Sequence, residues 1–384
     1  MAAPADFAAQ PLPPWRRAVL KVGSSLLAQP GGGLDDAHAR ALAAFIQAAR
    51  ASGREVVLVS SGAVAAGRGR VGDGGEGLVL RQALAALGQA ALIGFWQGLT
   101  DAPVAQVLLS HDDLRNRRRY LNARASLREL LRLGALPVVN ENDTVAVDEL
   151  KLGDNDNLAA AVASLVDADL LLIATDIGGL YSANPASDPT AVAITRVEQV
   201  TPALLQSAGG AAGSLGTGGM RTKLEAGAKA AAAGIGTALF CGRDADVVAA
   251  LGEGRLVGTL VAPLGSRLRA RQQWLRHAPA SGVLEMDAGA ASALGARGAS
   301  LLPGGISAVR GDFLRGDVVD LVAGDALLGR GLVQYSAHEV RRIAGRHSRE
   351  IESLLGFRYG EAVVHRDDLV LLDAVSAHAA GAAP

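Results

Sequence analysis

Short apolar runs alternate with longer amphipathic segments up to position 261, and this alternation predicts the fold. Runs typical of buried strands occupy positions 18–22, 55–59, 104–109, 136–139, 170–174, 237–240 and 258–261. Segments with helical spacing lie between them, at 35–52, 78–99, 114–133, 158–166, a stretch ending at 233 and a short one from 244. Strands that alternate with helices predict an α/β fold: a three-layer αβα sandwich around a mostly parallel sheet.

The pattern of apolar and glycine residues changes at position 281. From there strand-like pieces separated by glycine follow one another, as in AVRGDFLRGDVVDLV and LLGRGLVQYS, which indicates a small β domain. We therefore predict four segments. They are a disordered leader at 1–14, the α/β domain at 15–262, a basic, proline-bounded linker at 263–280, and the β domain with its tail at 281–384.

The composition argues against several classes of protein. The 384 residues suffice for two domains, and 37 basic against 38 acidic residues leave no global attraction to nucleic acid or an anionic membrane. The single cysteine excludes an internal disulfide framework and suits a reducing cytoplasm. No uninterrupted apolar run reaches the roughly 20 residues of a membrane span. Positions 281–384 hold ten Arg, no Lys and thirteen acids, which argues against strong binding of a phosphate backbone.

The most unusual stretch, at positions 140–157, reads NENDTVAVDELKLGDNDN and follows a predicted strand. Its short Asn and Asp side chains bond readily to backbone and to ammonium or carboxylate groups of a ligand. In open α/β sheets, ligands bind beyond the carboxyl ends of the strands, where this stretch lies. A ligand cradle and a solvated, turn-rich loop are both open interpretations.

Other strand ends carry small or polar residues as well. Lys21 ends one strand before Gly23, Ser61 and Gly62 follow the next, and Thr175 and Asp176 follow another. Small residues after a strand let backbone N–H groups approach a phosphate, and a lysine adds charge. Taken singly, a solvated lysine or a structural turn explains each of them equally well.

A glycine-rich loop, GGAAGSLGTGGMRTK at 209–223, runs into an alanine-rich helix. A flexible loop, a lysine and a helix N-terminus together favour an anion, although the spacing is not that of a Walker A motif. Lys223 is one of only four lysines among the 37 basic residues. Two matches to G-x-G-x-x-G within 67–77 are rejected as a dinucleotide fingerprint because no helix is expected to open directly after them.

Taken together, six motifs resemble the glutamate 5-kinase branch of the amino-acid kinase family. They are KVGSSLL, SSGAVAAGR, NEND, KLGDNDN, ATDIGGLY and GTGGMRTK, and they occur in the family's order. The C-terminal texture resembles a PUA domain, a β pseudo-barrel known from RNA-modifying enzymes and appended to many members of this branch. Arg81, where lysine is expected, and Arg221, at a variable loop position, depart from the pattern, as does the leader.

The resemblance implies a reaction and a set of site residues. The reaction is ATP-dependent phosphorylation of the side-chain carboxylate of L-glutamate, the first step of proline biosynthesis. Lys21 and Lys223 would contact the phosphates, with Asp156 holding both ammonium groups in place. Glutamate would be bound by Ser61, Asp143 and Asn155. The nucleotide would be bound by Lys21, Thr175, Asp176, Thr217, Gly218, Gly219, Met220, Arg221, Thr222 and Lys223.

The resemblance also implies cofactors and partners. Mg²⁺ would arrive with ATP, and no protein-held metal site is expected. L-Proline is expected as a feedback inhibitor, glutamyl-phosphate reductase as a pathway partner, and a homo-oligomer as the assembly. Two alternatives stay open: another member of the same family, acetylglutamate or aspartate kinase, or an RNA-binding or RNA-modifying protein that acts through the PUA-like tail.

Overall fold

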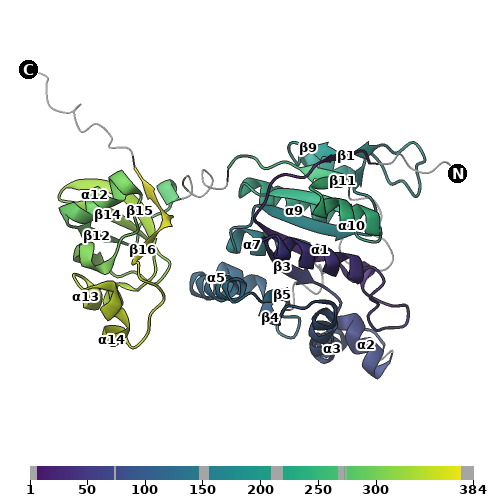
Figure 1. The fold of residues 1–384 in the computed structure, drawn as a ribbon, viewed down its shortest axis with the longest axis horizontal. Coiled ribbons are helices and arrows are strands. Elements are labelled where there is room, and N and C mark those ends of the chain that lie inside the picture. Colours follow the sequence, from purple (N-terminus) through teal and green to yellow (C-terminus); the bar gives the residue numbers. More distant parts are fainter. Residues whose placement is uncertain are drawn as a thin grey trace, which may run out of the picture. The chain divides into compact units, whose positions relative to one another are not determined.

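The computed structural model divides the chain into two compact units, Met1–Arg267 and Leu268–Pro384 (Figure 1). It describes residues 7–72, 75–146, 155–208, 219–266, 272 and 275–372. The first unit contains two large hydrophobic cores, and the second unit contains a core of its own.

The first unit alternates strands and helices along the chain, as the apolar pattern predicts. Its strands are β1 (Ala9–Pro11), β2 (Arg17–Val22), β3 (Glu55–Ser60), β4 (Val104–Leu109), β5 (Leu136–Glu141), β6 (Leu170–Thr175), β7 (Leu180–Tyr181), β8 (Ala193–Ile194), β9 (Arg196–Val197), β10 (Gly236–Cys241) and β11 (Arg255–Val261). Its helices are α1 (Ala39–Ala51), α2 (Ala63–Val71), α3 (Leu78–Leu99), α4 (His111–Arg115), α5 (Arg117–Arg132), α7 (Asn155–Leu165), α8 (Pro202–Ser207), α9 (Met220–Ala232) and α10 (Ala245–Gly252).

One mixed sheet organises this unit, in the order β1-β11-β10-β6-β2-β3-β5-β4, with β9 also paired to β11. Neighbours from β10 to β4 run parallel, whereas β11 is antiparallel to both β10 and β1. The carboxyl ends of β6, β2, β3 and β5 therefore meet at one edge of the sheet. The predicted mostly parallel sheet is confirmed.

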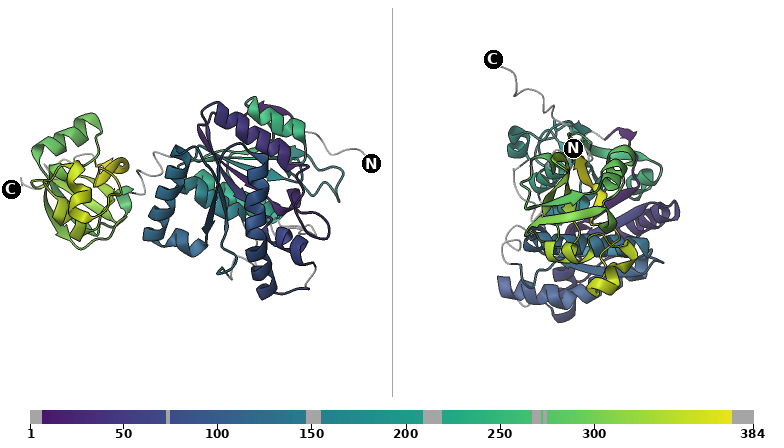
Figure 2. Two further views of the ribbon diagram at one scale, coloured as in Figure 1. Left: turned by 60° about the horizontal axis from the view of Figure 1, so that its bottom comes forward. Right: turned by 90° about the vertical axis from the view of Figure 1, so that its left-hand side faces the viewer.

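Helices cover both faces of the sheet and give it two cores (Figure 2). Successive residues of the central strands point to opposite faces, so Leu20 and Leu58 pack into the core formed with α1, α3 and α10. Val19 and Val57 pack into the other core, with α5, α7 and α9. A strand buried on both faces has to be apolar throughout, which explains the continuous runs in the sequence.

Helix α3 is unusually long and apolar. An 18-residue window of this 22-residue helix has a mean hydropathy of 1.5, so by length and composition alone it could cross a membrane, contrary to the sequence expectation. One such helix is weak evidence, because core helices of soluble proteins have the same composition. Leu84, Leu92 and Trp96 are buried in the unit, although only 28% of that window is buried, and one helix of this kind does not indicate a membrane protein.

The structure corrects three expectations in this unit. Residues 7–14 are not a disordered leader, because β1 pairs with β11 and Phe7 and Leu12 are buried. Contrary to the expectation, a helix does open directly after the glycine-rich stretch at 67–77, because α3 starts at Leu78 with Gly77 as its N-cap, and α2 covers the stretch as far as Val71. The helix predicted at 114–133 is broken at Asn116, whose extended backbone and side chain cap the start of α5.

The second unit contains a separate five-stranded sheet in the order β13-β12-β14-β15-β16. Its elements are β12 (Gly282–Met286), α12 (Ala288–Arg297), β13 (Ile306–Gly311), β14 (Val318–Ala323), β15 (Ala326–Val333), α13 (Ala337–Ile343), α14 (Ile351–Leu355) and β16 (Val364–Leu371). Leu275 and Ala278 pack against Val318 and Leu332, so the connector is shorter than the predicted 263–280.

Candidate active site

The polar residues at the strand ends come together at the carboxyl edge of the first unit's sheet. Lys21 lies near the end of β2, Ser61 follows β3, and Thr175 is the last residue of β6. Their strands are neighbours in the parallel part of the sheet. Helix α7 starts at Asn155 and brings Asp156 to the same place.

Two lysines share one buried carboxylate. The Nζ atom of Lys21 lies 2.6 Å from Oδ1 of Asp156, and that of Lys223 lies 3.1 Å from Oδ2. The Oγ1 hydroxyl of Thr222 donates a hydrogen bond of 2.9 Å to the same Oδ2. Asp156 is 1% exposed, Lys21 5% and Lys223 7%. This lysine–aspartate–lysine group, Lys21–Asp156–Lys223, joins residues more than 60 positions apart in the sequence.

The charges of this group depend on one another. Burial raises the pKa of Asp156, but Lys21 and Lys223, together with hydrogen bonds from Lys21 and Thr222, outweigh it and lower that pKa from 3.8 to about 2. Burial lowers the pKa of Lys223, while Asp156 opposes this change and Lys21 adds to it. Asp156 is therefore ionised at neutral pH, and the group with both lysines charged carries a net positive charge that suits a phosphate ligand.

Backbone geometry leaves room for an anion beside the lysines. A Cβ atom added at Gly23 would lie 3.3 Å from the Nζ atom of Lys21, so a side chain there would crowd the ammonium group. Helix α9 begins after Gly219, and Thr222 and Lys223 stand in its first turn. Free N–H groups and the helix dipole at such a terminus favour a negative charge.

A chain of amides occupies the neighbouring part of the site. The Nδ2 group of Asn155 donates to Oγ of Ser61 at 2.7 Å and to Oδ1 of Asn140 at 3.0 Å. The Nδ2 group of Asn140 in turn donates to Oε1 of Gln89, on α3, at 3.0 Å. Asn140 and Gln89 were not predicted as site residues. The signal for Gln89 was present, since it is the one polar residue on the buried face of α3.

Asp143 lies in the turn after β5, at the same edge of the sheet. Burial raises the pKa of Asp143 from 3.8 to about 6, and the charge of Arg81 on α3 opposes this rise. Arg81 is thus close enough to act on a predicted glutamate contact, which makes its departure from the family pattern relevant to the site.

The structure describes most, but not all, of the residues predicted to bind the nucleotide. Thr175 is buried and accepts a hydrogen bond from the backbone N–H of Ile177, while Asp176 is exposed and its charge reaches Lys223. Arg221 is exposed and pairs with Glu225 one helical turn further on. Met220 is half-buried, in the first turn of α9 beside Thr222. Thr217, Gly218 and positions 147–154 lie outside the described residues.

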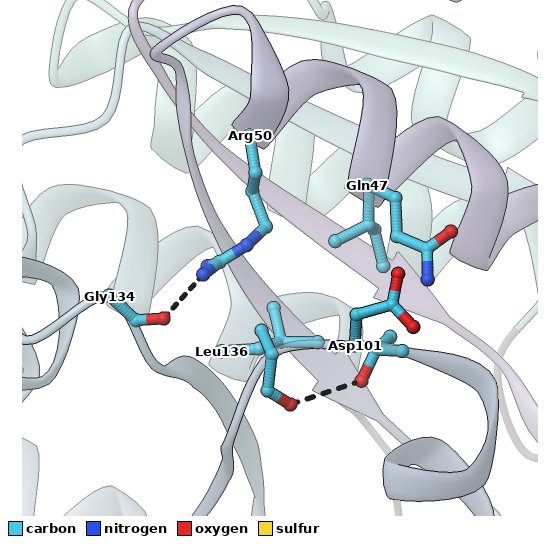
Figure 3. A pocket seen from close by; sticks show the side chains of 8 residues that line it. Gln47, Arg50, Asp101, Gly134 and Leu136 are labelled. Atoms are coloured by element: carbon cyan, nitrogen blue, oxygen red, sulfur yellow. Dashed lines mark hydrogen bonds between the residues drawn. The ribbon is translucent and has the colours of Figure 1, made fainter.

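A cavity of about 300 Å³ lies at the opposite edge of the sheet (Figure 3). It is lined by the end of α1 and the amino ends of β4 and β5, including Gln47, Arg50 and Asp101. The guanidinium of Arg50 already donates to the backbone carbonyls of Gly134 and Ala135. The cavity therefore takes no part in the site formed at the carboxyl ends of the strands.

The described residues contain no group of three or more His, Cys, Asp or Glu side chains suited to a metal ion. In the lysine–aspartate–lysine group, both oxygens of the carboxylate already contact ammonium groups. This donor set suits an anion and not a bare divalent cation.

Comparison with known proteins assigns the chain to a family. A model of the amino acid kinase family matches residues 16–241. The chain belongs to the amino acid kinase family. A PUA domain model matches residues 282–355. The expected family, fold class and PUA domain are confirmed, and this member of the amino acid kinase family is an enzyme.

Relatives of this amino acid kinase cover almost its whole length. The glutamate 5-kinase of Xanthomonas euvesicatoria pv. vesicatoria (strain 85-10) is 63% identical over 362 residues, covering 92% of this chain and all of the relative. The glutamate 5-kinase of Xylella fastidiosa (strain 9a5c) is 61% identical over 378 residues, covering 96% and 98%. Among solved structures, UMP kinase from Bacillus anthracis aligns with a TM-score of 0.45 at 15% identity, over 65% of this chain and 97% of that one.

Proposed function

We propose that the chain is a glutamate 5-kinase, which transfers the γ-phosphoryl group of ATP to the side-chain carboxylate of L-glutamate and so opens proline biosynthesis. The relatives at 61–63% identity support this reaction. The observation that carries it in the structure is the buried group Lys21–Asp156–Lys223, next to the amide chain that begins at Ser61.

The reaction needs no catalytic base from the protein. The γ-carboxylate of glutamate is ionised at pH 7, since its pKa is roughly 4.3. The enzyme has to bring two anions together and stabilise the charge on the transferring phosphoryl group. Lys21 and Lys223 would do so together, and Asp156 would hold both ammonium groups in position. Ser61, Asp143 and Asn155 would bind the amino acid, and Thr175, Asp176 and the start of α9 the nucleotide.

Mg²⁺ would enter the site bound to the nucleotide. The described donor set suits anions, so phosphate oxygens of ATP would supply the ligands of the ion. When bound, Mg²⁺ would neutralise part of the phosphate charge. Lys21 and Lys223 would screen the remainder.

Release of ADP with a panel of free amino acids tests the function. Only L-glutamate should support turnover well above the rate without an amino acid. A strong response to N-acetylglutamate or aspartate with none to glutamate would reject the assignment in favour of another member of the family.

Regulation, location and partners are further parts of the proposal. L-Proline shares with glutamate an α-carboxylate and a neighbouring cationic nitrogen, so it would compete with glutamate at Asp143 and Asn155. The reaction product would pass to glutamyl-phosphate reductase, and the single cysteine suits a cytoplasmic location.

A homo-oligomer is the proposed assembly. The outer face of α3 supports it, because Val79 is 77% and Leu87 47% exposed, and the exposed residues between them, Ala83 and Ala86, are small. Sedimentation should give a mass above 39.0 kDa, and Leu87→Glu should lower it. An unchanged mass in the variant would exclude this face.

A further inference from the structure

The amide chain at the amino-acid end of the site runs in one direction in the structure. Asn155 uses Nδ2 to donate to both Ser61 and Asn140, so its Oδ1 atom points elsewhere. Asn140 can accept at Oδ1 only if its Nδ2 group faces the other way, toward Gln89. Gln89 presents Oε1 there and accepts that hydrogen bond at 3.0 Å. Reversing one amide alone would bring two donors or two acceptors together, so the three amides share one orientation.

This direction leaves an acceptor and a donor unused. In the described part of the chain, Oδ1 of Asn155 and Nε2 of Gln89 are buried atoms without a hydrogen-bond partner. Asn155 and Gln89 are each only 8% exposed. Leaving a buried polar atom unpaired costs about 1–3 kcal/mol, so the unpaired acceptor of Asn155, whose side chain bonds to Ser61, suggests a ligand group that donates to it.

Close packing of α2 against α3 fixes the position of Gln89. A Cβ atom added at Gly88 would lie 1.8 Å from the carbonyl oxygen of Ala63, and one at Gly67 would lie 2.0 Å from that of Leu84. The two helices thus touch backbone to backbone, which only glycine permits. Since α2 starts two residues after Ser61, the same contact holds both ends of the amide chain in register.

We propose that Gln89 is a positioning residue of the amino-acid site, which orients Asn155 through Asn140 so that Oδ1 of Asn155 accepts from the substrate's ammonium group. This inference rests on the proposed function. Gln89 itself need not touch the substrate. Its effect passes through two hydrogen bonds and should therefore alter the affinity for the amino acid more than the rate of transfer or the affinity for ATP.

Two substitutions at Gln89 separate this role from simple packing. Gln89→Met keeps the length of the side chain but removes the acceptor, so the KM for L-glutamate should rise about tenfold, while the KM for ATP and kcat stay within about twofold. Gln89→Glu keeps an oxygen for Asn140 to bond, so the KM for glutamate should return to within about threefold of the unaltered enzyme.

Gln97→Met is the matched control on the same helix. Its side chain bonds to backbone near the end of α3, away from Asn140. This variant should lose thermal stability but keep its KM for glutamate. A similar rise in KM in Gln89→Met and Gln97→Met would mean that only the packing of α3 matters, and would overturn the inference.

Other results would also overturn the inference. An unchanged KM in Gln89→Met overturns the positioning role while glutamate turnover by the unaltered enzyme upholds the proposed function. A KM as high in Gln89→Glu as in Gln89→Met would instead assign Nε2 to a direct substrate contact and also overturn it. If Gln89→Met does not fold, Gln89→Ala, which also removes the acceptor, takes its place with the same expected rise in KM and the same overturning results. No glutamate-dependent turnover in the unaltered enzyme would reject the proposed function and this inference together.

Discussion

The two ends of the candidate site bury polar groups in opposite ways. At the phosphate end, Lys21 and Lys223 are both paired with Asp156, so the charges hold one another in place without a ligand. At the amino-acid end, a chain of neutral amides leaves Oδ1 of Asn155 and Nε2 of Gln89 without partners in the described residues.

The difference fits the task of each end. A transferring phosphoryl group changes its charge distribution, and lysines held by a buried carboxylate can meet that charge without being reorganised. The α-ammonium and α-carboxylate groups of the amino acid keep their charges during the reaction, so the part of the site that binds them needs directed donors and acceptors instead. We expect substitutions at the phosphate end to lower kcat and those at the amino-acid end to raise the KM for glutamate.

The largest effect is expected from Lys21→Ala and Lys223→Ala. Each should lower kcat by a factor of about 10² or more with the fold intact, because each removes charge that acts on the transferring group. Lys223→Arg should also be slow, since a planar guanidinium cannot replace a compact ammonium group. Steady-state kinetics with circular dichroism as a check on folding measure this.

Lys229→Ala is the control for these variants. Lys229 lies further along α9, is exposed, and donates to Asn157 at 2.5 Å. It should retain kcat within about twofold. Near-normal turnover in either Lys21→Ala or Lys223→Ala would show that the lysine–aspartate–lysine group is structural and would remove the contrast between the two ends.

A smaller effect is expected from Asp143→Asn at the other end. Glutamate and proline both present a cationic nitrogen, and loss of the partner of a buried cation costs on the order of 1 to 3 kcal/mol for either ligand. The KM for glutamate and the inhibition constant for proline should rise together, with kcat little changed. A variant that binds glutamate weakly but keeps full sensitivity to proline would place the inhibitor at a separate site.

How much the sequence predicts also differs between the two ends. Lys21, Asp156 and Lys223 stand out because lysine is rare in this chain and the motifs around them are distinctive. The structure brings these three together, as the resemblance implied. The strands are predictable as well, because burial on both faces demands continuous apolar runs.

Tertiary contacts account for what the sequence does not predict. Helix α2 contains Gly67 and Gly69, which lower helix propensity, and packing against α3 compensates for this. Strand β1 is only three residues long and exists through its pairing with β11. Gln89 functions through Asn140, 51 positions away, and no local pattern reports that contact.

Removal of the second unit should have a modest effect on both ends. The described contacts of the site all lie within the first unit, so a chain that ends at Arg267 should keep glutamate-dependent turnover within about tenfold. Kinetics and thermal unfolding of the shortened chain measure this. A folded but inactive product would mean that the PUA unit supplies part of the site.

The smallest effect is a change in the pH dependence of turnover. It tests whether the charge of Asp143 contributes to glutamate binding at the amino-acid end. Burial raises the pKa of Asp143 to about 6, so at pH 5 roughly nine in ten free enzyme molecules would carry a neutral carboxyl there. Because only the ionised form attracts an ammonium group, kcat/KM for glutamate should fall below about pH 6. The substrate's own carboxylate titrates lower, near 4.3, and does not account for this.

Since Arg81 lowers the pKa of Asp143, Arg81→Gln should move the fall to higher pH by up to about one unit. Asp143→Asn should remove it. A fall with the same midpoint in all three enzymes would show that another group is titrating.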